Sequence, residues 1–142
     1  MIVNEFCNCY AFRQISSKMT KIYDEALLIS GLKITQFAIL KYINILKITN
    51  LNNLATSMSY NRSTLGRNIR ILERKKLIYL NTGKNKREIE ISMTNKGLKV
   101  LKVSRKCWEE INKQITKKLG INKKKMIDEL MNDKFFKTRG SV

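Results

Sequence analysis

Apolar residues recur at steps of three and four through most of the chain, which is the spacing of one face of an α-helix. A first run covers residues 6–29 and ends before Gly31, a residue type that commonly terminates helices. A second run begins at Thr35, and a short third run covers residues 50–58. Threonine and asparagine, which open the second and third runs, are residue types that cap helices. The pattern therefore predicts three helices in this part of the chain.

The next run, residues 61–76, separates apolar from basic side chains. Ile69 and Leu72 lie within about 40° of Leu65 when successive residues are set about 100° apart around a helix axis. The opposite side carries one hydroxyl and three guanidinium groups, those of Ser63, Arg67, Arg70 and Arg74. The apolar face is therefore expected in the core, and the arginine face is expected to point outward.

Beyond residue 76 the periodicity changes to that of β-strands. Residues 77–80 and 88–93 alternate or are rich in β-branched residues, and a polar, basic loop joins them, which predicts a β-hairpin with a basic tip. Helical spacing returns after Thr94, breaks at Gly120 and resumes to about residue 136. The expected fold is mainly α with a small β wing. A short helix, a basic helix and a basic hairpin in this order are typical of a winged helix-turn-helix.

Composition narrows the possible functions. The 142 residues include 29 Lys and Arg against 11 Asp and Glu, and the formal charge of +18 favours a polyanionic partner such as nucleic acid. The chain has no histidine, which excludes Ser-His and Cys-His catalysis and His-containing metal sites. Neither paired carboxylates nor a phosphate-binding glycine loop stands out. The sequence therefore indicates a protein that is not an enzyme and needs no cofactor.

The sequence gives no sign of a membrane protein. Its apolar stretches, such as residues 37–40, fall far short of the roughly 20 residues that span a bilayer. The first ten residues lack the pattern of a secretory signal. Three cysteines, an odd number, suit reduced thiols better than a disulfide framework. We expect a cytoplasmic protein.

Five short segments match one protein family. In order along the chain they read LKITQFAIL, LNNLA, STLGRNIRILERKKLI, NKR and MTNKG. Over nearly its whole length the chain resembles the MarR family of bacterial transcription regulators. The resemblance implies one domain over residues 1–142, with a winged helix-turn-helix lobe at 33–97 and N- and C-terminal dimerisation helices at 6–29 and 98–136. It also implies a homodimer that binds a palindrome in double-stranded DNA. Such a dimer would be a nucleoid-associated repressor. In a stress response, a small aromatic ligand or a peroxide would release it from the DNA.

The residues expected to contact DNA lie on the basic helix and at the hairpin tip: Arg62, Ser63, Thr64, Arg67, Asn68, Arg70, Arg74, Lys84, Lys86 and Arg87. Arg67, in the middle of the arginine face, suits bidentate recognition of a guanine edge. The family's wing usually carries an aspartate two residues before its arginine, and here Asn85 stands in that place before Arg87. An amide carries no charge, so we expect the wing arginine to be held less firmly. The alternative to a DNA-binding surface is a basic helix face that is merely solvated. A second basic element in the expected place, at the wing, disfavours this alternative.

Cys9 is a candidate redox sensor. In the branch of the family that senses organic hydroperoxides, a reactive cysteine lies ten residues before a Met-Thr pair, and Cys9 stands ten residues before Met19. Tyr23 fits one of the tyrosines that hydrogen-bond the thiolate in that branch, whereas Arg13 and Phe37 stand where two others are expected. The resemblance to that branch is therefore partial.

Other interpretations of the thiols stay open. Cys107, on the long C-terminal helix, is a possible resolving thiol for an oxidised Cys9. Alternatively, Cys9 is an ordinary small core residue. A third interpretation is a soft metal ion bound by Cys7, Cys9 and Cys107, but the sequence offers no histidine or further cysteine as a fourth ligand.

A ligand pocket is the remaining candidate site. In the family such pockets lie between the dimerisation helices and the DNA-binding lobe, here near Phe12, Tyr23, Phe37 and Tyr42, although these aromatic residues can equally be plain core. Two other functions compete with that of a regulator. A non-specific architectural nucleic-acid-binding protein would also carry a charge of +18, and a thiol peroxidase would use Cys9 catalytically.

Overall fold

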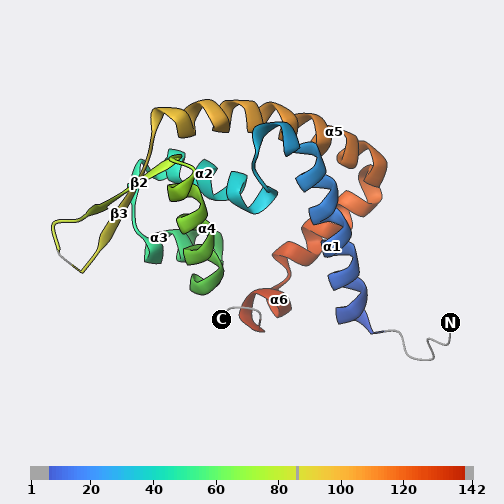
Figure 1. Cartoon of the computed structure of the whole chain (residues 1–142). Coiled ribbons are helices and arrows are strands. Elements are labelled where there is room, and N and C mark those ends of the chain that lie inside the picture. Colours follow the sequence, from blue (N-terminus) through green and yellow to red (C-terminus); the bar gives the residue numbers. More distant parts are fainter. Residues whose placement is uncertain (1–6, 86, 140–142) are drawn as a thin grey trace.

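The protein is described by a computed structural model that covers residues 7–85 and 87–139 (Figure 1). Its elements follow the chain as α1 Asn8–Ala26, the 3-10 helix η1 Leu28–Ser30, α2 Ile34–Leu46, β1 Ile48–Thr49, α3 Leu51–Met58, α4 Arg62–Arg74, β2 Ile78–Thr82, β3 Ile89–Met93, α5 Asn95–Asn132 and α6 Lys134–Arg139. Helices α2, α3 and α4 and the sheet form one lobe, from which α1, the far half of α5 and α6 extend (Figure 1). The predicted fold, mainly α with a small β wing, is confirmed.

Three helix starts follow directly from the sequence. The side chain of Asn50 accepts a hydrogen bond from the Asn53 N–H at 2.8 Å, and that of Asn61 accepts one from the Ser63 N–H at 2.8 Å. Thr94 caps the first turn of α5 in the same way. Each cap satisfies a backbone donor that has no partner within its helix.

The predicted cap of α2 at Thr35 is wrong, because two other side chains satisfy the free backbone donors. The helix begins at Ile34, whose N–H donates to Asp24 Oδ1 of α1 at 2.8 Å. The N–H of Lys33 donates to Gln36 Oε1 at 3.1 Å. Helix α1 therefore holds the start of α2, a contact that no pattern within a single helix reveals.

The core lies around α2, which packs against α3, α4, α5 and the sheet. The apolar face predicted for α4 is part of it, since the exposed fraction is 0% for Leu65, 5% for Ile69 and 0% for Leu72. Burying one such side chain contributes about 1.5–3 kcal/mol. This burial fixes which side of α4 points outward. Ser59 ends α3 in a left-handed conformation (φ 52°), which turns the chain sharply into α4.

The wing is a three-stranded antiparallel sheet in the order β1–β3–β2. Strands β2 and β3 pair from Ile78 opposite Met93 to Thr82 opposite Ile89, as a hairpin requires. Strand β1 adds only two residues beside β3. The hairpin was predicted and this third strand was not, because two residues are too few to show an alternating pattern.

The long helices differ from the prediction in detail. Most of the run predicted over residues 6–29 forms α1 and η1, and Gly31 follows in a left-handed conformation (φ 73°). Helix α5 is broken at Gly120 (φ 74°, ψ 172°), as the sequence predicted. The last predicted helix is itself divided at Asp133, after which α6 begins. Within the described part of the chain, no helix is long and apolar enough to cross a membrane.

Candidate nucleic-acid interface

The outward face of α4 is a row of exposed polar and basic side chains. It consists of Ser63, Thr64, Arg67, Arg70 and Arg74, and Arg62 is exposed at the start of the helix. The ion pairs found between described residues, Lys124 with Asp128 and Lys125 with Glu129, both lie within α5. No acidic side chain described in the structure therefore neutralises an arginine of α4. The positive charge of this face is available to an external anion.

Two side chains of α4 contact their own helix. Arg67 Nε lies 3.4 Å from the Ser63 carbonyl oxygen, a long hydrogen bond. By contrast, Asn68 Nδ2 donates to the Thr64 carbonyl oxygen at 2.9 Å, and the Asn68 side chain is half-buried. Three residues after Leu65, it falls toward the buried side of the helix. The structure therefore places Asn68 at the margin of the arginine face, whereas Arg67 lies at its centre.

The wing tip presents Lys84 and Arg87 as exposed residues. The side-chain oxygen of Asn85 lies 3.5 Å from the backbone nitrogen of Arg87, at the limit of a hydrogen bond. The amide thus faces the backbone of the turn. No ion pair between described residues involves the Arg87 guanidinium. Lys86, the third predicted wing contact, lies outside the described residues.

Two lysines that the sequence analysis missed hold the far end of α4. Lys75 Nζ donates to the Gly31 carbonyl oxygen at 2.6 Å, and Lys96 Nζ donates to the Lys75 carbonyl oxygen at 3.0 Å. The first bond ties α4 to the turn after η1, and the second ties it to α5. Lysine near a helix C-terminus commonly binds free carbonyl groups, and this is the signal that could have revealed the role.

The cysteines are not gathered in one place. Cys7 precedes α1 and Cys9 lies in its first turn, and both are exposed. Cys107 is half-buried and borders a hollow of about 380 Å³ together with Ala26, at the other end of α1. Since a helix rises about 1.5 Å per residue, Cys9 lies about 25 Å from Ala26. A disulfide needs Cα atoms within about 7 Å, so the predicted pairing of Cys9 with Cys107 is wrong within one chain.

The soft-metal interpretation of the cysteines also lacks support. Among the residues that the structure describes, no three His, Cys, Asp or Glu side chains are grouped to hold a metal ion. Cys9 lies at one end of α1, whereas Cys107 of α5 lies beside Ala26 at the other end. The two thiols are therefore too far apart to bind one metal ion.

Tyr23 joins α1 to α5. Its hydroxyl donates to Asn112 Oδ1 at 2.7 Å, and burial raises the pKa of the Tyr23 phenol above its usual value. The phenol therefore stays protonated and donates at neutral pH. Cys9 lies about 21 Å away along the same helix. Within one chain, the structure does not bring the predicted tyrosine to the predicted thiol.

The four aromatic residues predicted to line a ligand pocket do not line one together. Phe37 is buried, with 3% of its surface exposed, and stacks on Trp108 with ring centroids 5.9 Å apart. Tyr42 is half-buried against the core. Phe12 is 55% exposed and lies about 16 Å from Tyr23 along α1. Phe37 and Tyr42 therefore fit the alternative interpretation, in which they are ordinary core residues.

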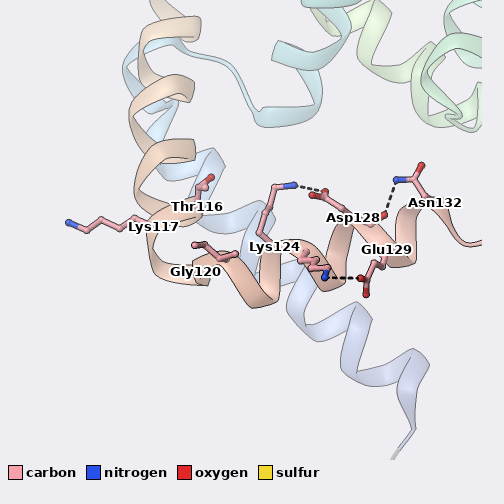
Figure 2. A pocket seen from close by; sticks show the side chains of 9 residues that line it. Thr116, Lys117, Gly120, Lys124, Asp128, Glu129 and Asn132 are labelled. Carbon is pink, nitrogen blue, oxygen red and sulfur yellow. Dashed lines mark hydrogen bonds and ion pairs between the residues drawn. The ribbon is translucent and has the colours of Figure 1, made fainter.

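A hollow of about 810 Å³ lies instead beside the bend of α5 (Figure 2). Thr116 and Gly120 border it on one side of the bend, and Lys124, Asp128 and Asn132 on the other. Lys124 pairs with Asp128, whose carbonyl oxygen accepts a hydrogen bond from Asn132 Nδ2 at 2.8 Å. The charges of Lys124 and Lys125 are thus paired along the helix with those of Asp128 and Glu129, whereas Lys117, which also borders the hollow, forms no ion pair with a described residue.

The elements that extend from the lobe expose apolar side chains. On α1, Phe12, Ile15 and Ile22 share one face and are 55%, 58% and 42% exposed. At the other end of the chain, Met131 is 71% exposed and Phe135 is 57% exposed. Exposed apolar side chains that share one helix face, as on α1, are typical of a site of protein association.

The solved structures that share this fold include three protein–DNA complexes. The transcriptional regulator MosR of M. tuberculosis, solved in complex with DNA, is 29% identical, with 88% of this chain and 93% of MosR covered and a TM-score of 0.78. The S. aureus MepR–DNA complex is 25% identical, with coverages of 89% and 94% and a TM-score of 0.76. A variant of E. coli MarR with operator DNA, 18% identical over 86% and 89% of the two chains, shares the fold at a TM-score of 0.76. No family model and no curated protein matches the sequence.

Proposed function

Because the chain belongs to the MarR family of winged-helix regulators, we propose that it is a sequence-specific DNA-binding transcription regulator. The observation that carries the proposal is the face of α4. Its arginines are exposed and unpaired among described residues, while Leu65 and Leu72 on the opposite side are fully buried. MosR and MepR, which share this fold, were each solved in complex with DNA. As such a regulator, the protein would act at the nucleoid in the cytoplasm.

In this proposal α4 enters the major groove, which is wide enough to admit an α-helix. Arg67, at the centre of the face, reaches base edges, whereas Arg70 and Arg74 contact phosphates of the flanking backbone. The wing residues Lys84 and Arg87 contact the DNA beside the groove. The hydrogen bonds of Lys75 and Lys96 join the far end of α4 to the turn after η1 and to α5.

The phosphate role of Arg70 and Arg74 has a direct test. Each phosphate contact that is lost removes a released counterion, so the slope of log K against log salt should become shallower by about 0.9 per contact. We expect Arg70→Ala and Arg74→Ala each to show this change with little effect on sequence preference. A salt titration of binding to one duplex measures the slope. A slope equal to that of the unaltered protein would contradict a phosphate contact.

We further propose that the protein acts as a homodimer through α1 and the C-terminal helices. The exposed apolar face of α1 would be buried against a second copy, and so would the exposed apolar residues of the far half of α5 and of α6. Burial of apolar surface is the main favourable term in such association. Two copies would present two α4 helices to one duplex, which suits a palindromic site.

Ile15→Ala is expected to weaken dimerisation about tenfold, which corresponds to about 1.4 kcal/mol. The reason is the loss of apolar area that the dimer would bury on the stripe formed by Phe12, Ile15 and Ile22. Sedimentation equilibrium measures the dissociation constant. Ser17→Ala, on the opposite and exposed face of α1, is the matched control and should leave it unchanged. If the unaltered protein and Ile15→Ala are both monomeric, or if their dimer dissociation constants are equal, this face of α1 is not part of the interface.

For regulation, we propose that the protein is a repressor and that Cys9 is its oxidant-sensing thiol. The thiol is exposed at the start of α1, where a peroxide can reach it. The sulfur attacks one peroxide oxygen, the O–O bond breaks, and the products are a cysteine sulfenic acid and an alcohol. A small aromatic ligand is the alternative signal, with weaker support because the four expected aromatic residues do not form one pocket.

Cys9→Ser is expected to keep its DNA after treatment with an organic hydroperoxide, whereas the unaltered protein should release it. Serine keeps the size of the side chain but forms no sulfenic acid. Retention of a labelled duplex in a mobility-shift experiment measures the difference, and Cys107→Ser serves as the control for a second thiol. Equal release by the unaltered protein and by Cys9→Ser would exclude Cys9 as the sensor.

Two experiments separate this proposal from its competitors. A sequence-specific regulator should bind its site about a thousandfold more tightly than random duplex at physiological salt, whereas a purely architectural protein should bind both alike. A thiol peroxidase would consume hydroperoxide continuously when a thiol reductant is supplied, whereas a sensor reacts once per reactive thiol. The fold's relatives named above are regulators, which favours the sensor.

A further inference from the structure

The outward side of α5 carries a second row of positive charge. Five lysines fall within about 60° of one another around the helix, on the side opposite to the buried residues Leu101 and Ser104. All five are exposed, and we call them the lysine ridge: Lys99, Lys102, Lys106, Lys113 and Lys117. The ridge spans about 27 Å, since the helix rises about 1.5 Å per residue.

No lysine of the ridge forms an ion pair with a side chain that the structure describes. The ion pairs found between described residues involve Lys124 and Lys125, beyond the bend of α5, and none involves the ridge. Glu109 and Glu110 lie at its margins, and Glu110 Oε1 accepts a hydrogen bond from Gln114 Nε2 at 3.0 Å. Figure 2 shows that Lys117 points away from the paired side chains beside the bend. The ridge is therefore available to an external polyanion.

The ridge and the arginine face of α4 lie on different sides of the molecule. Helix α2 packs against both α4 and α5 and so stands between them. In Figure 1, α5 runs along one edge of the lobe, and α4 lies on the other side of α2. A duplex bound along α4 therefore leaves the ridge uncovered.

Resting on the proposed DNA-binding function, we infer that the lysine ridge is a second DNA-binding surface, which holds another duplex segment without sequence preference while α4 occupies the first. Lysine is suited to phosphate contact as a point charge and does not fix a planar base edge. An anionic membrane fits less well, because an interfacial helix buries an apolar face among the lipids, and the apolar face of this half of α5 already packs against α2. Next to a bound site, the same DNA molecule supplies other segments at high effective concentration.

The test uses the full chain on an immobilised duplex. The duplex has the sequence that the protein selects from a random pool, or a random sequence if none is selected. After unbound protein is washed away, a labelled duplex of unrelated sequence is added and its retention is measured. We expect protein-dependent retention that falls at least about tenfold in Lys102→Gln/Lys106→Gln/Lys113→Gln, since each lost phosphate contact removes about 0.9 released counterions. Binding to the immobilised duplex should stay within about twofold of the unaltered protein, because α4 is unchanged.

Lys21→Gln/Lys118→Gln/Lys123→Gln is the matched control, with the same loss of charge at exposed lysines outside the ridge. It should retain the labelled duplex as the unaltered protein does. Equal retention by the ridge variant and the control, or no retention on a protein-loaded duplex, would overturn the inference. So would ridge-dependent binding of phosphatidylserine vesicles without retention of a second duplex. A failure of the proposed function itself would give a different result: the protein would then prefer no sequence from the random pool.

Discussion

Replacing Gly97 by alanine is expected to lower the free energy of unfolding by about 3 kcal/mol, the upper end of the usual cost of overpacking. A Cβ at this position would lie 2.1 Å from the Leu77 carbonyl oxygen and 2.8 Å from Met93 Sδ. The sulfur can move, but the carbonyl is held, because it accepts the Thr94 N–H at 3.1 Å. The start of α5 would have to move away from the strands of the wing.

Gly66→Ala is the matched control for Gly97→Ala, because it is the same substitution within another helix. Nothing lies within 4 Å of a Cβ built at Gly66. Alanine is favoured over glycine in a helix interior by about 1 kcal/mol, so this variant should be slightly more stable. Urea unfolding at one fixed protein concentration measures both changes. An unfolding midpoint for Gly97→Ala that equals that of the unaltered protein would contradict the close approach of α5 to Leu77.

Arg67→Ala is expected to weaken binding to the selected duplex about tenfold to a hundredfold and to relax the preference at one base position. This range follows from the 1–3 kcal/mol that a bidentate arginine–guanine contact contributes to discrimination. The position of Arg67 at the centre of the outward face motivates the expectation, since residues toward the ends of the helix face the flanking phosphates. Competition binding with single-base variants of the duplex measures the effect.

Arg13→Ala is the control for charge, because Arg13 is exposed on α1, outside the lobe that carries α4. It removes one positive charge without touching the proposed interface, so its sequence preference should not change. A selectivity profile of Arg67→Ala identical to that of the unaltered protein would mean that Arg67 reads no base. A uniform loss over all sequences would instead assign Arg67 to a phosphate.

The elements predicted correctly are those whose signal is local and repeated. The face of α4 formed by Leu65, Ile69 and Leu72 could be read from three positions at helical spacing, and all three are buried. The cap at Asn50 acts on a backbone group only three residues away. Such features depend on the chain near each residue, so the sequence alone is enough to find them.

The errors concern contacts between elements. The ammonium group of Lys75, the residue after α4, binds the Gly31 carbonyl oxygen, a role that its place in a basic stretch does not reveal. The need for glycine at position 97 likewise comes from the carbonyl oxygen of Leu77, the residue just before β2. These roles depend on how the helices pack, which local periodicity does not encode.

The central claim, that the arginine face of α4 reads duplex DNA as part of a symmetric pair, is tested most directly by selection from a pool of random duplexes. The DNA recovered by the purified protein is sequenced after several rounds at physiological salt. We predict an enriched palindrome whose half-sites are centred about 10 base pairs apart, one helical turn of DNA. A recovered pool that remains random would contradict the claim.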